Sequence, residues 1–463
     1  MLISRYKNLP LAKMLPKKKS KNQMLFLVES YIFLILIGTV LLRCPFSLKA
    51  PIRWIDALFT ATSATCVTGL SVIDIGSVFS NTGLWIIAAL IQIGGLGIMT
   101  FSTAILLLSG MRPGFNQQAM LKSNFTQEEQ IDPIKILLAV IPFTFILEGI
   151  GALVLFTQFD KFPLNDRILY SVFHSISAFC NAGFSPFHDS LMSYQFNPVV
   201  CLSICALVLA GGFGFLSLAE TRNFLNFKTH SIQRISLHTK IAFFFTLIII
   251  LVASTAILTI EWNGAFADES IPQKMLSSCF MVISARTAGF NNIDLLTLQE
   301  TSLLLIIVTM FIGANPGSCG GGIKTTTAAV IALLGFNRIL GREKTQVLGR
   351  TIPEETVDKA VRIFIIYTIM IVIGTFLLLI TEYAGVSYKM GIPHFLKVFF
   401  EVVSALTTCG LSLGLTPDLT FLGRIVICII MFIGRMGALF LISAVAKKVE
   451  GGVWYAEEDI MVG

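Results

Sequence analysis

Long apolar segments alternate with shorter ones along nearly the whole chain, and the same order recurs four times. Because about 20 apolar residues cross a bilayer, the long segments are predicted to form eight transmembrane helices, at about 25–42, 84–108, 134–156, 199–218, 241–260, 301–334, 363–380 and 421–445. The shorter segments do not reach across and are predicted to be four re-entrant half-helices, at 51–64, 167–179, 272–283 and 393–403.

A short stretch that begins with Ser-Ala and ends with glycine follows each predicted half-helix. The four copies are Ser63-Ala64-Thr65-Cys66-Val67-Thr68-Gly69, Ser177-Ala178-Phe179-Cys180-Asn181-Ala182-Gly183, Ser284-Ala285-Arg286-Thr287-Ala288-Gly289 and Ser404-Ala405-Leu406-Thr407-Thr408-Cys409-Gly410. The third copy is one residue shorter, and successive glycines are 114, 106 and 121 residues apart. This regularity predicts one structural unit repeated four times.

The position of these stretches predicts a cation filter. Irregular backbone at membrane depth is tolerated only where protein buries it or where it lines a watery cavity. Four such strands around one axis would form a ring of carbonyl oxygens, which is how a potassium filter replaces the hydration shell of the ion. Glycine permits the positive φ that aims neighbouring carbonyls the same way, and the half-helices would point their partly negative ends at the ring.

The predicted K⁺ filter consists of residues 65–69, 180–183, 286–289 and 407–410, with K⁺ at Gly69, Gly183, Gly289 and Gly410. The alternative is that these glycines are turns between buried helices. That alternative does not explain why Ser-Ala precedes the glycine in every copy.

Composition supports a polytopic membrane protein built from repeats. The 463 residues are 55% hydrophobic and 13% charged, whereas soluble chains carry about 25% charged residues. The predicted units are a basic N-terminal segment 1–24, repeats 25–109, 134–219, 241–336 and 363–446, loops 110–133, 220–240 and 337–362, and a tail 447–463. The nine cysteines show no CxxC pair, which argues against a metal site.

The distribution of positive charge predicts the orientation. Of the 34 Lys and Arg residues, 22 lie in the N-terminal segment, the loops between repeats, their flanking helix ends and the tail. By the positive-inside tendency, these parts and both termini are cytoplasmic. The filter stretches then lie toward the outer face.

The returning long segments carry a second, weaker repeat of small residues. Gly94, Gly211, Gly313 and Gly434 lie 25, 28, 24 and 24 residues after the filter glycines of their repeats. This spacing predicts one level below the filter that small residues line or pack. Close helix packing through small residues is the simpler interpretation for the first two repeats.

The third and fourth repeats depart from this pattern and predict a gate. In the third, the predicted loop 313–326 contains Gly313, Asn315, Pro316, Gly317, Ser318, Cys319, Gly320, Gly321, Gly322 and Lys324. Five glycines and a proline are incompatible with an ordinary helix interior. The loop resembles a phosphate-binding loop in composition, but it lacks the G-x-x-x-x-G-K-[ST] spacing.

At the matching level of the fourth repeat, Arg435 lies within an apolar helix. An arginine inside the membrane marks a functional site by default, although neighbouring helix ends could satisfy it. We expect a movable loop and an electrostatic barrier at one depth.

Four degenerate pore repeats, each with one filter glycine, resemble the SKT superfamily of cation translocators, which includes the TrkH, KtrB, HKT and Trk proteins. The similarity covers nearly the whole chain. Eight spans without an extra N-terminal pair, and the tail Tyr455–Gly463, favour the KtrB branch over TrkH. The resemblance implies K⁺ uptake, commonly Na⁺-dependent, across the bacterial inner membrane. It also implies that the third-repeat loop is the gate and that four filter glycines favour K⁺ over Na⁺.

The resemblance further implies partners. These are a second copy of the chain, forming a homodimer within the lipid bilayer, and a cytoplasmic ring of KtrA-type RCK subunits. ATP or ADP would bind the ring and not this chain, and no nucleic acid is expected.

Two other classes of function remain as alternatives. An alternating-access secondary transporter also has broken helices at the midplane, but such folds usually contain two inverted repeats, whereas this chain shows four parallel ones. An enzyme is not expected, because the five histidines do not pair with Asp or Glu at ligand spacing.

Overall fold

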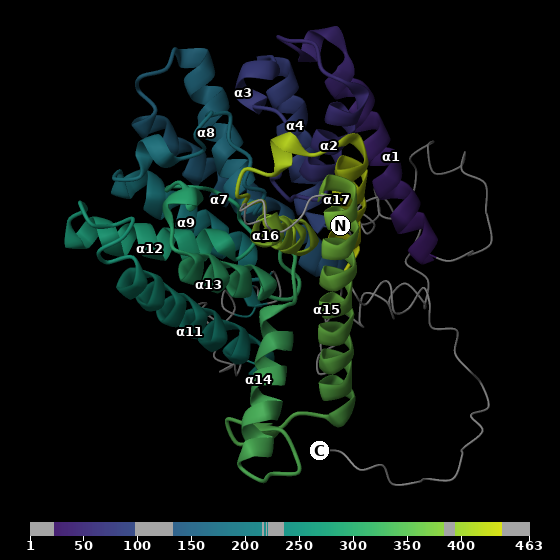
Figure 1. Cartoon of the computed structure of the whole chain (residues 1–463), viewed down its shortest axis with the longest axis vertical. Coiled ribbons are helices and arrows are strands. Elements are labelled where there is room, and N and C mark those ends of the chain that lie inside the picture. Colours follow the sequence, from purple (N-terminus) through teal and green to yellow (C-terminus); the bar gives the residue numbers. More distant parts are fainter. Residues whose placement is uncertain are drawn as a thin grey trace, which may run out of the picture.

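The described part of the chain, in a computed structural model, comprises residues 23–97, 133–214, 217–218, 220, 236–383 and 394–437 and is almost entirely helical (Figure 1). Its one sheet is a hairpin of two short antiparallel strands, β1 (Gln346–Val347) and β2 (Arg350–Thr351). The expectation of an all-α polytopic membrane protein therefore holds for these residues, apart from this hairpin.

The helices fall into four groups in chain order. The first two groups are α1 (Gln23–Arg43), α2 (Trp54–Thr65), α3 (Ile75–Val78) and α4 (Asn81–Gly95), then α7 (Pro133–Gln158), α8 (Leu164–Phe179) and α9 (Pro198–Gly212). The last two are α11 (Leu237–Ile260), α12 (Ile271–Ala285), α13 (Glu300–Phe311) and α14 (Thr325–Ile339), then α15 (Glu354–Tyr383), α16 (His394–Thr407) and α17 (Phe421–Met436). Short 3₁₀ turns at Pro45–Ser47, Met192–Tyr194, Leu295–Thr297 and Thr416–Asp418 connect them.

Three of these helices are long and apolar enough to cross a membrane, namely Val140–Gln158, Leu237–Ile260 and Glu354–Tyr383. Other apolar helices are shorter, and several predicted spans, such as 84–108 and 421–445, continue outside the described residues. The predicted span 301–334 is divided into α13 and α14 by an irregular segment at residues 312–324. The number of eight spans therefore stays a prediction.

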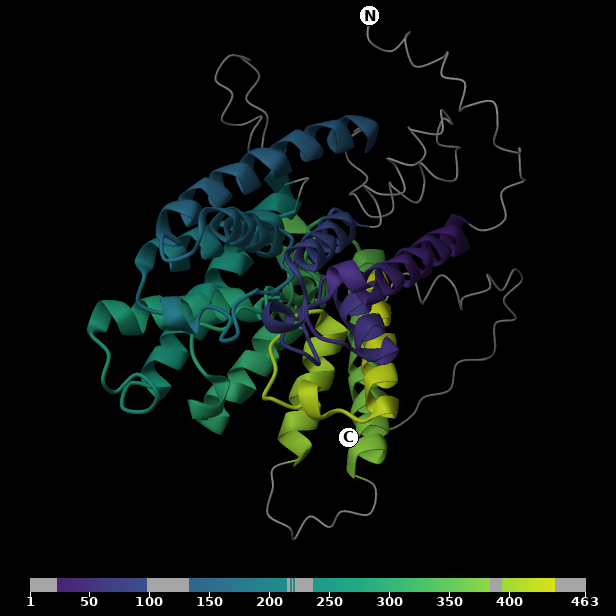
Figure 2. The ribbon, with the colours of Figure 1, turned by 90° about the horizontal axis from the view of Figure 1, so that it is seen from above.

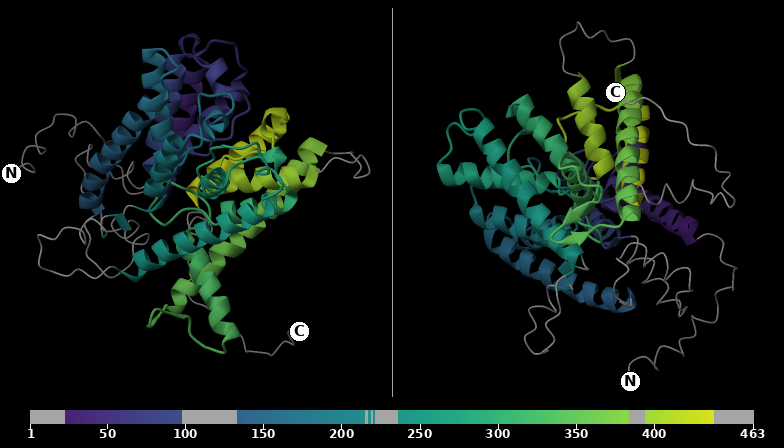
Figure 3. Two further views of the ribbon diagram at one scale, coloured as in Figure 1. Left: turned by 90° about the vertical axis from the view of Figure 1, so that its left-hand side faces the viewer. Right: turned by 90° about the horizontal axis from the view of Figure 1, so that it is seen from below.

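The four groups follow one another around a common centre, and the first lies beside the last (Figure 2). The short helix of each group packs against a later helix of the group before it, in the pairs α4–α8, α9–α12, α13–α16 and α17–α2. The last pair closes the circle between the two ends of the described chain. Away from this centre, α14, the β1–β2 hairpin and the start of α15 project together, around a small apolar cluster that includes Val330 and Val357 (Figure 3).

A phenylalanine anchors each short central helix. Phe59, Phe173 and Phe400 lie ten residues before the glycine of their stretch, and Phe280 lies nine before the glycine of the shorter third one. All four side chains are buried. Burying an aromatic side chain contributes on the order of 2 kcal/mol or more, so this position fixes how deeply each helix sits.

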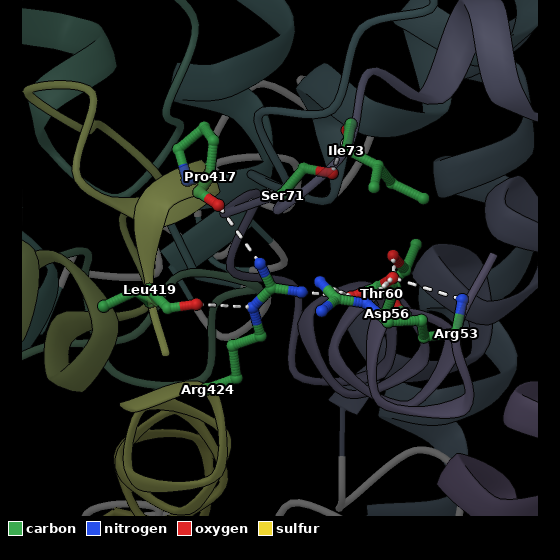
Figure 4. Close-up of polar contacts among 8 residues, drawn as sticks. All are labelled: Arg53, Asp56, Thr60, Ser71, Ile73, Pro417, Leu419 and Arg424. Atoms are coloured by element: carbon green, nitrogen blue, oxygen red, sulfur yellow. Dashed lines mark hydrogen bonds and ion pairs between the residues drawn. The ribbon is translucent and has the colours of Figure 1, made fainter. Parts of the chain in front are cut away.

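A buried ion pair joins the first and last groups. Arg424, near the start of α17, contacts the Asp56 carboxylate on α2, and both side chains are buried (Figure 4). Arg424 also donates to the carbonyl oxygens of Leu419 (2.9 Å) and Pro417 (3.1 Å). The other carboxylate oxygen of Asp56 accepts from Nε of Arg53 at 3.1 Å. The two buried charges, those of Asp56 and Arg424, are therefore paired with each other, which is the condition for burying ions.

We expect Asp56→Asn and Arg424→Gln each to lower the free energy of unfolding by about 3–5 kcal/mol, because each leaves one buried charge without its partner. The measurement is thermal unfolding of the purified protein in detergent. Arg53→Gln is the matched control: its side chain is 69% exposed, so its loss should change stability by about 1 kcal/mol or less. Equal unfolding midpoints for all three variants would contradict the ring-closing role of the pair.

Candidate functional site

The four glycines of the repeated stretches meet in a closed ring. Beside each glycine, the place that a Cβ would take is already filled by the backbone of the next stretch. The contacting atom is in each case the carbonyl oxygen of the residue before the next glycine: that of Ala182 beside Gly69, Ala288 beside Gly183, Cys409 beside Gly289 and Thr68 beside Gly410. No larger residue fits at any of these positions. The prediction that these distant stretches converge on one centre is confirmed by these contacts.

All four stretches share one backbone conformation. Their glycines have φ of +96°, +69°, +75° and +97°. Two residues earlier, a non-glycine residue also has positive φ in every copy: Val67 (56°), Asn181 (59°), Thr287 (69°) and Thr408 (51°). Positive φ is strained for β-branched residues. Such strain clusters at ligand-binding sites, and here it recurs in the three copies that have a β-branched residue at this position, Val67, Thr287 and Thr408.

The serine of each stretch holds the turn closed. The Ser63 and Ser404 hydroxyl oxygens accept from the backbone N–H groups of Gly69 (3.1 Å) and Gly410 (3.0 Å). In the other two copies, the Ser177 and Ser284 hydroxyls donate to the carbonyl oxygens of Phe184 (2.8 Å) and Phe290 (2.6 Å). This function explains why serine recurs in all four copies.

The third stretch accommodates its missing residue locally. There the Gly289 N–H donates directly to the Ser284 carbonyl at 3.1 Å. The ring conformation is retained, since Thr287 and Gly289 keep the positive φ of their counterparts.

The short helices all end at the ring. Helices α2, α8, α12 and α16 end at Thr65, Phe179, Ala285 and Thr407, three or four residues before their glycines. The C-terminus of a helix carries roughly half a negative charge. Four such ends make the ring electronegative without any acidic side chain.

The second series of glycines packs against these helix ends. A Cβ at Gly94, Gly211 or Gly434 would collide with a carbonyl oxygen at the end of a short helix, namely that of Thr65, Phe179 or Leu406. Close packing through small residues is therefore confirmed at these positions. In the third group, Gly313 instead contacts Gly321 of the irregular segment that follows it.

The glycine-rich segment at residues 312–324, called the glycine loop below, folds back on itself beside the ring. Ile312 and Ile323 form a parallel bridge, and the N–H of Gly313 donates to the Ile323 carbonyl at 2.9 Å. On the ring side, Gly320 and Gly321 lie directly against the hydroxyls of Thr287 and Thr408, where a Cβ would collide. The loop therefore touches two of the four stretches.

Arg435 connects the glycine loop to the opposite side of the ring. Its Nη1 donates to the Cys319 carbonyl at 2.5 Å, and its Nη2 donates to the Gly94 carbonyl near the end of α4. Arg435 thus contacts both the loop, at whose depth the sequence placed it, and a helix end, as the alternative interpretation of this arginine requires. Lys324 also donates within the loop, to the Gly320 carbonyl at 2.6 Å.

Arg286 fastens the glycine loop, a role that the sequence did not indicate. Although it belongs to the third stretch, its buried side chain points to the glycine loop. It donates to Thr325 Oγ1 (2.8 Å), the Gly313 carbonyl (3.3 Å) and Thr246 Oγ1 (3.3 Å). Gly313 lies at the start of the loop and Thr325 directly follows its end, so this one guanidinium fastens both ends of the loop. No sequence motif distinguishes this role from that of a filter residue.

Four threonine hydroxyls at the ring have no hydrogen-bond partner among the described residues. They belong to Thr65, Thr68, Thr287 and Thr408, and all four side chains are buried. Buried hydroxyls are normally paired, so these four oxygens are unused hydrogen-bonding groups concentrated at the ring. Within the described chain, no group of three or more His, Cys, Asp or Glu could hold a metal ion.

Comparison with known proteins identifies relatives over nearly the full length. A family model described as TrkH, cation transport protein, matches residues 2–454. Ktr system potassium uptake protein B of Bacillus subtilis (strain 168) is 36% identical over 440 residues, which is 94% of this chain and 96% of that protein. Potassium/sodium uptake protein NtpJ of Enterococcus hirae is 34% identical over 453 residues, 96% of this chain and 98% of that protein.

Among solved structures, the crystal structure of the potassium transporter TrkH from Vibrio parahaemolyticus has the same fold. The TM-score is 0.72 at 21% identity, covering 93% of this chain and 86% of that one.

Proposed function

Because the chain belongs to the TrkH family of cation transport proteins, we propose that it carries K⁺ across a bacterial inner membrane and that the ring of Gly69, Gly183, Gly289 and Gly410 is its selectivity filter. The observation that carries the proposal is the closed ring itself, in which four positive-φ glycines touch backbone to backbone. Relatives named as potassium uptake proteins support K⁺ as the transported ion. The name of the potassium/sodium relative supports Na⁺ as a second ion that influences uptake.

A ring of this kind suits a weakly hydrated monovalent cation. Backbone carbonyls replace the hydration shell of K⁺ without burying a compensating negative charge. The converging helix ends favour positive charge by partial dipoles. Residues 65–69, 180–183, 286–289 and 407–410 supply these groups, with the contribution of Arg286 confined to its backbone because its side chain leaves the ring.

We expect Gly69→Ser, Gly183→Ser, Gly289→Ser and Gly410→Ser to weaken the preference for K⁺ over Na⁺. A Cβ at positive φ is strained, and it would displace the neighbouring carbonyl from its place in the ring. The measurement is Na⁺ competition with K⁺ uptake in liposomes. Gly335→Ser is the control, since a Cβ there meets nothing within 4 Å. Wild-type competition in all four ring variants would refute the filter assignment.

We propose that the glycine loop and Arg435 form the gate. The loop lies against Thr287 and Thr408, and Arg435 fastens it to α4. A fixed cation in a narrow passage of low dielectric repels K⁺ far more strongly than it would in water. Conduction therefore requires the loop to move, and this movement breaks hydrogen bonds. Gly317 and Gly322 already have positive φ and carry no side chain that would hinder a change of backbone conformation.

Shortening the loop within residues 317–322 and substituting Arg435→Ala should each raise K⁺ flux in liposomes above that of the wild type, because each removes part of the barrier. Arg338→Gln serves as the control for loss of a positive charge, since Arg338 is exposed on α14. Monodisperse variants that conduct no faster than the wild type would show that Arg435 is a structural tie and that the loop is a passive lining.

We also propose a topology and a set of partners. The topology has eight spans, four re-entrant half-helices and cytoplasmic termini. The partners are a second copy of the chain, forming a homodimer, and a cytoplasmic KtrA-type RCK ring that binds ATP or ADP. The distribution of Lys and Arg supports the orientation, and the naming of relatives as parts of a Ktr system supports additional subunits. The projecting α14, hairpin and start of α15 offer such a ring a surface (Figure 3).

We expect K⁺ flux through the purified chain alone to be insensitive to ATP and ADP, and to become sensitive once the ring subunit is added. The measurement is flux in liposomes with and without the ring, at matched nucleotide concentrations. A nucleotide response of this chain by itself would contradict the assignment of the nucleotide site to the ring.

A further inference from the structure

Two glycines of the glycine loop, called the loop tip below, rest on two threonines of the ring. A Cβ at Gly320 would collide with the hydroxyl oxygen of Thr287, and a Cβ at Gly321 would collide with the hydroxyl oxygen of Thr408. Glycine is therefore needed at both positions while the loop lies here. The backbone of the loop tip covers the two hydroxyls directly.

Neither hydroxyl gains a hydrogen bond from this contact. Within the described residues, Oγ1 of Thr287 and Oγ1 of Thr408 have no partner, and both oxygens are closed off from solvent. Both residues are completely buried, so a water molecule has no room beside either oxygen. A polar group that is buried without a partner is destabilising. The seated position of the loop therefore carries an energetic cost at the point where the loop meets the ring.

The ring conformation itself does not need these hydroxyls. Both threonines lie two residues before a ring glycine, where the backbone has positive φ in every stretch. The first stretch has Val67 at this position, with φ of 56°, close to the 51° of Thr408. Valine has the shape of threonine without the hydroxyl, so the same backbone accommodates a side chain that would carry no such cost.

Hydrogen bonds from basic side chains hold the loop tip in place against this cost. Arg435 donates to the carbonyl of Cys319, directly before the tip, at 2.5 Å. Lys324 donates to the carbonyl of Gly320 at 2.6 Å. Two kinds of contact thus act on one short segment, and they act in opposite directions.

We propose that Thr287 and Thr408 are positioning residues that bias the glycine loop toward release. While the tip is seated, both hydroxyls lack partners. When the tip withdraws, they face the space that it leaves, where water or K⁺ can bind them. The free energy recovered there offsets part of the cost of breaking the bonds from Arg435 and Lys324. This inference deepens the proposed gate and rests on it for its effect on flux.

The sign of the effect distinguishes the two kinds of contact. Removing a bond that holds the loop, as in Arg435→Ala, favours release. Replacing an unpaired hydroxyl by a methyl group, as in Thr287→Val and Thr408→Val, favours the seated loop, because the seated state then no longer buries an unsatisfied oxygen. A merely structural role of the threonines would give no such opposition of signs.

The primary test measures release of the loop without requiring conduction. Cys319 is a completely buried loop residue next to the tip, so its reaction with N-ethylmaleimide reports release. The rate is followed in full-length protein in liposomes by mass spectrometry of the peptide that contains Cys319. We expect it to fall about tenfold in each valine variant and to rise in Arg435→Ala. Valine variants that react at the wild-type rate would overturn the proposal.

Two further substitutions control for shape and for burial. Thr287→Ser and Thr408→Ser keep the hydroxyl, so Cys319 should react in them at about the wild-type rate. A fall as large as in the valine variants would show that the shape of the side chain matters and not its hydroxyl, against the proposal. Thr144→Val removes another completely buried, unpaired hydroxyl, but on α7, outside the ring and the loop. It should change neither the Cys319 rate nor K⁺ flux, and a fall there equal to that in the ring would also contradict the proposal.

K⁺ flux in liposomes separates an action on the loop from an action on ions in the filter. Each valine substitution should lower flux about tenfold with the intact loop, and much less after deletion of Gly320 and Gly321, which removes the seated tip. An equal fall in both backgrounds would assign the effect to conduction through the filter and refute the positioning role.

The two measurements also distinguish failure of this inference from failure of the gate. Flux that rises in Arg435→Ala, with Cys319 rates unchanged in both valine variants, would refute the positioning role and leave the gate in place. Slower reaction of Cys319 in the valine variants without any change in flux would support the bias on the loop and refute the gate.

Discussion

Direct backbone contact among four glycines is the constraint on which the rest of this structure depends. At each of these positions a carbonyl oxygen of the next stretch occupies the space that a Cβ would need. The surrounding elements keep the four stretches this close to one another. Serines close the turns, buried phenylalanines set the depth of the short helices, and a second series of glycines lets the following helices press against the helix ends. A ring with so little free space holds one geometry, as discrimination between ions by carbonyl position requires.

The glycine loop is held by a different kind of interaction. Hydrogen bonds from Arg435, Arg286 and Lys324 to its carbonyls fasten it beside the ring. A carbonyl can exchange one donor for another, or for water, at modest net cost, whereas a steric contact between backbones cannot be exchanged. Movement of the loop, which the proposed gate requires, would thus exchange hydrogen bonds, although the loop and the ring are in contact at Thr287 and Thr408.

Several features of the third group of helices occur together. It has the shortened stretch, the irregular segment between α13 and α14, and the arginine that fastens that segment. These features belong together. Interrupting a helix frees backbone groups that need partners, and Arg286 supplies donors for them from the adjacent stretch. The ring keeps its conformation because the shortened turn is compensated within a few residues, at Ser284 and Gly289.

Features that depend on local chemistry could be predicted from the order of residues alone. Alternating apolar segments gave the order of long and short helices, and the recurring glycines marked the stretches that converge. Glycines and a proline made a continuous helix impossible near Pro316, and a lone cation in an apolar segment singled out Arg435. Each of these signals is a property of neighbouring residues, so no tertiary information was needed. No pattern in the sequence singled out Asp56 or indicated its partner.

The pairing of polar groups that are distant in the chain could not be predicted and is known only from the folded structure. Asp56 and Arg424 are 368 residues apart, and Arg435 reaches Gly94 across 341. Arg286 shares a stretch with ring residues, yet its side chain turns away from the ring to three oxygens, those of Gly313 in the glycine loop, Thr325 at the start of α14 and Thr246 on α11. The physical reason is the same in each case. A buried polar group must find partners, but which of the many donors and acceptors lies within reach depends on how the helices pack around the ring.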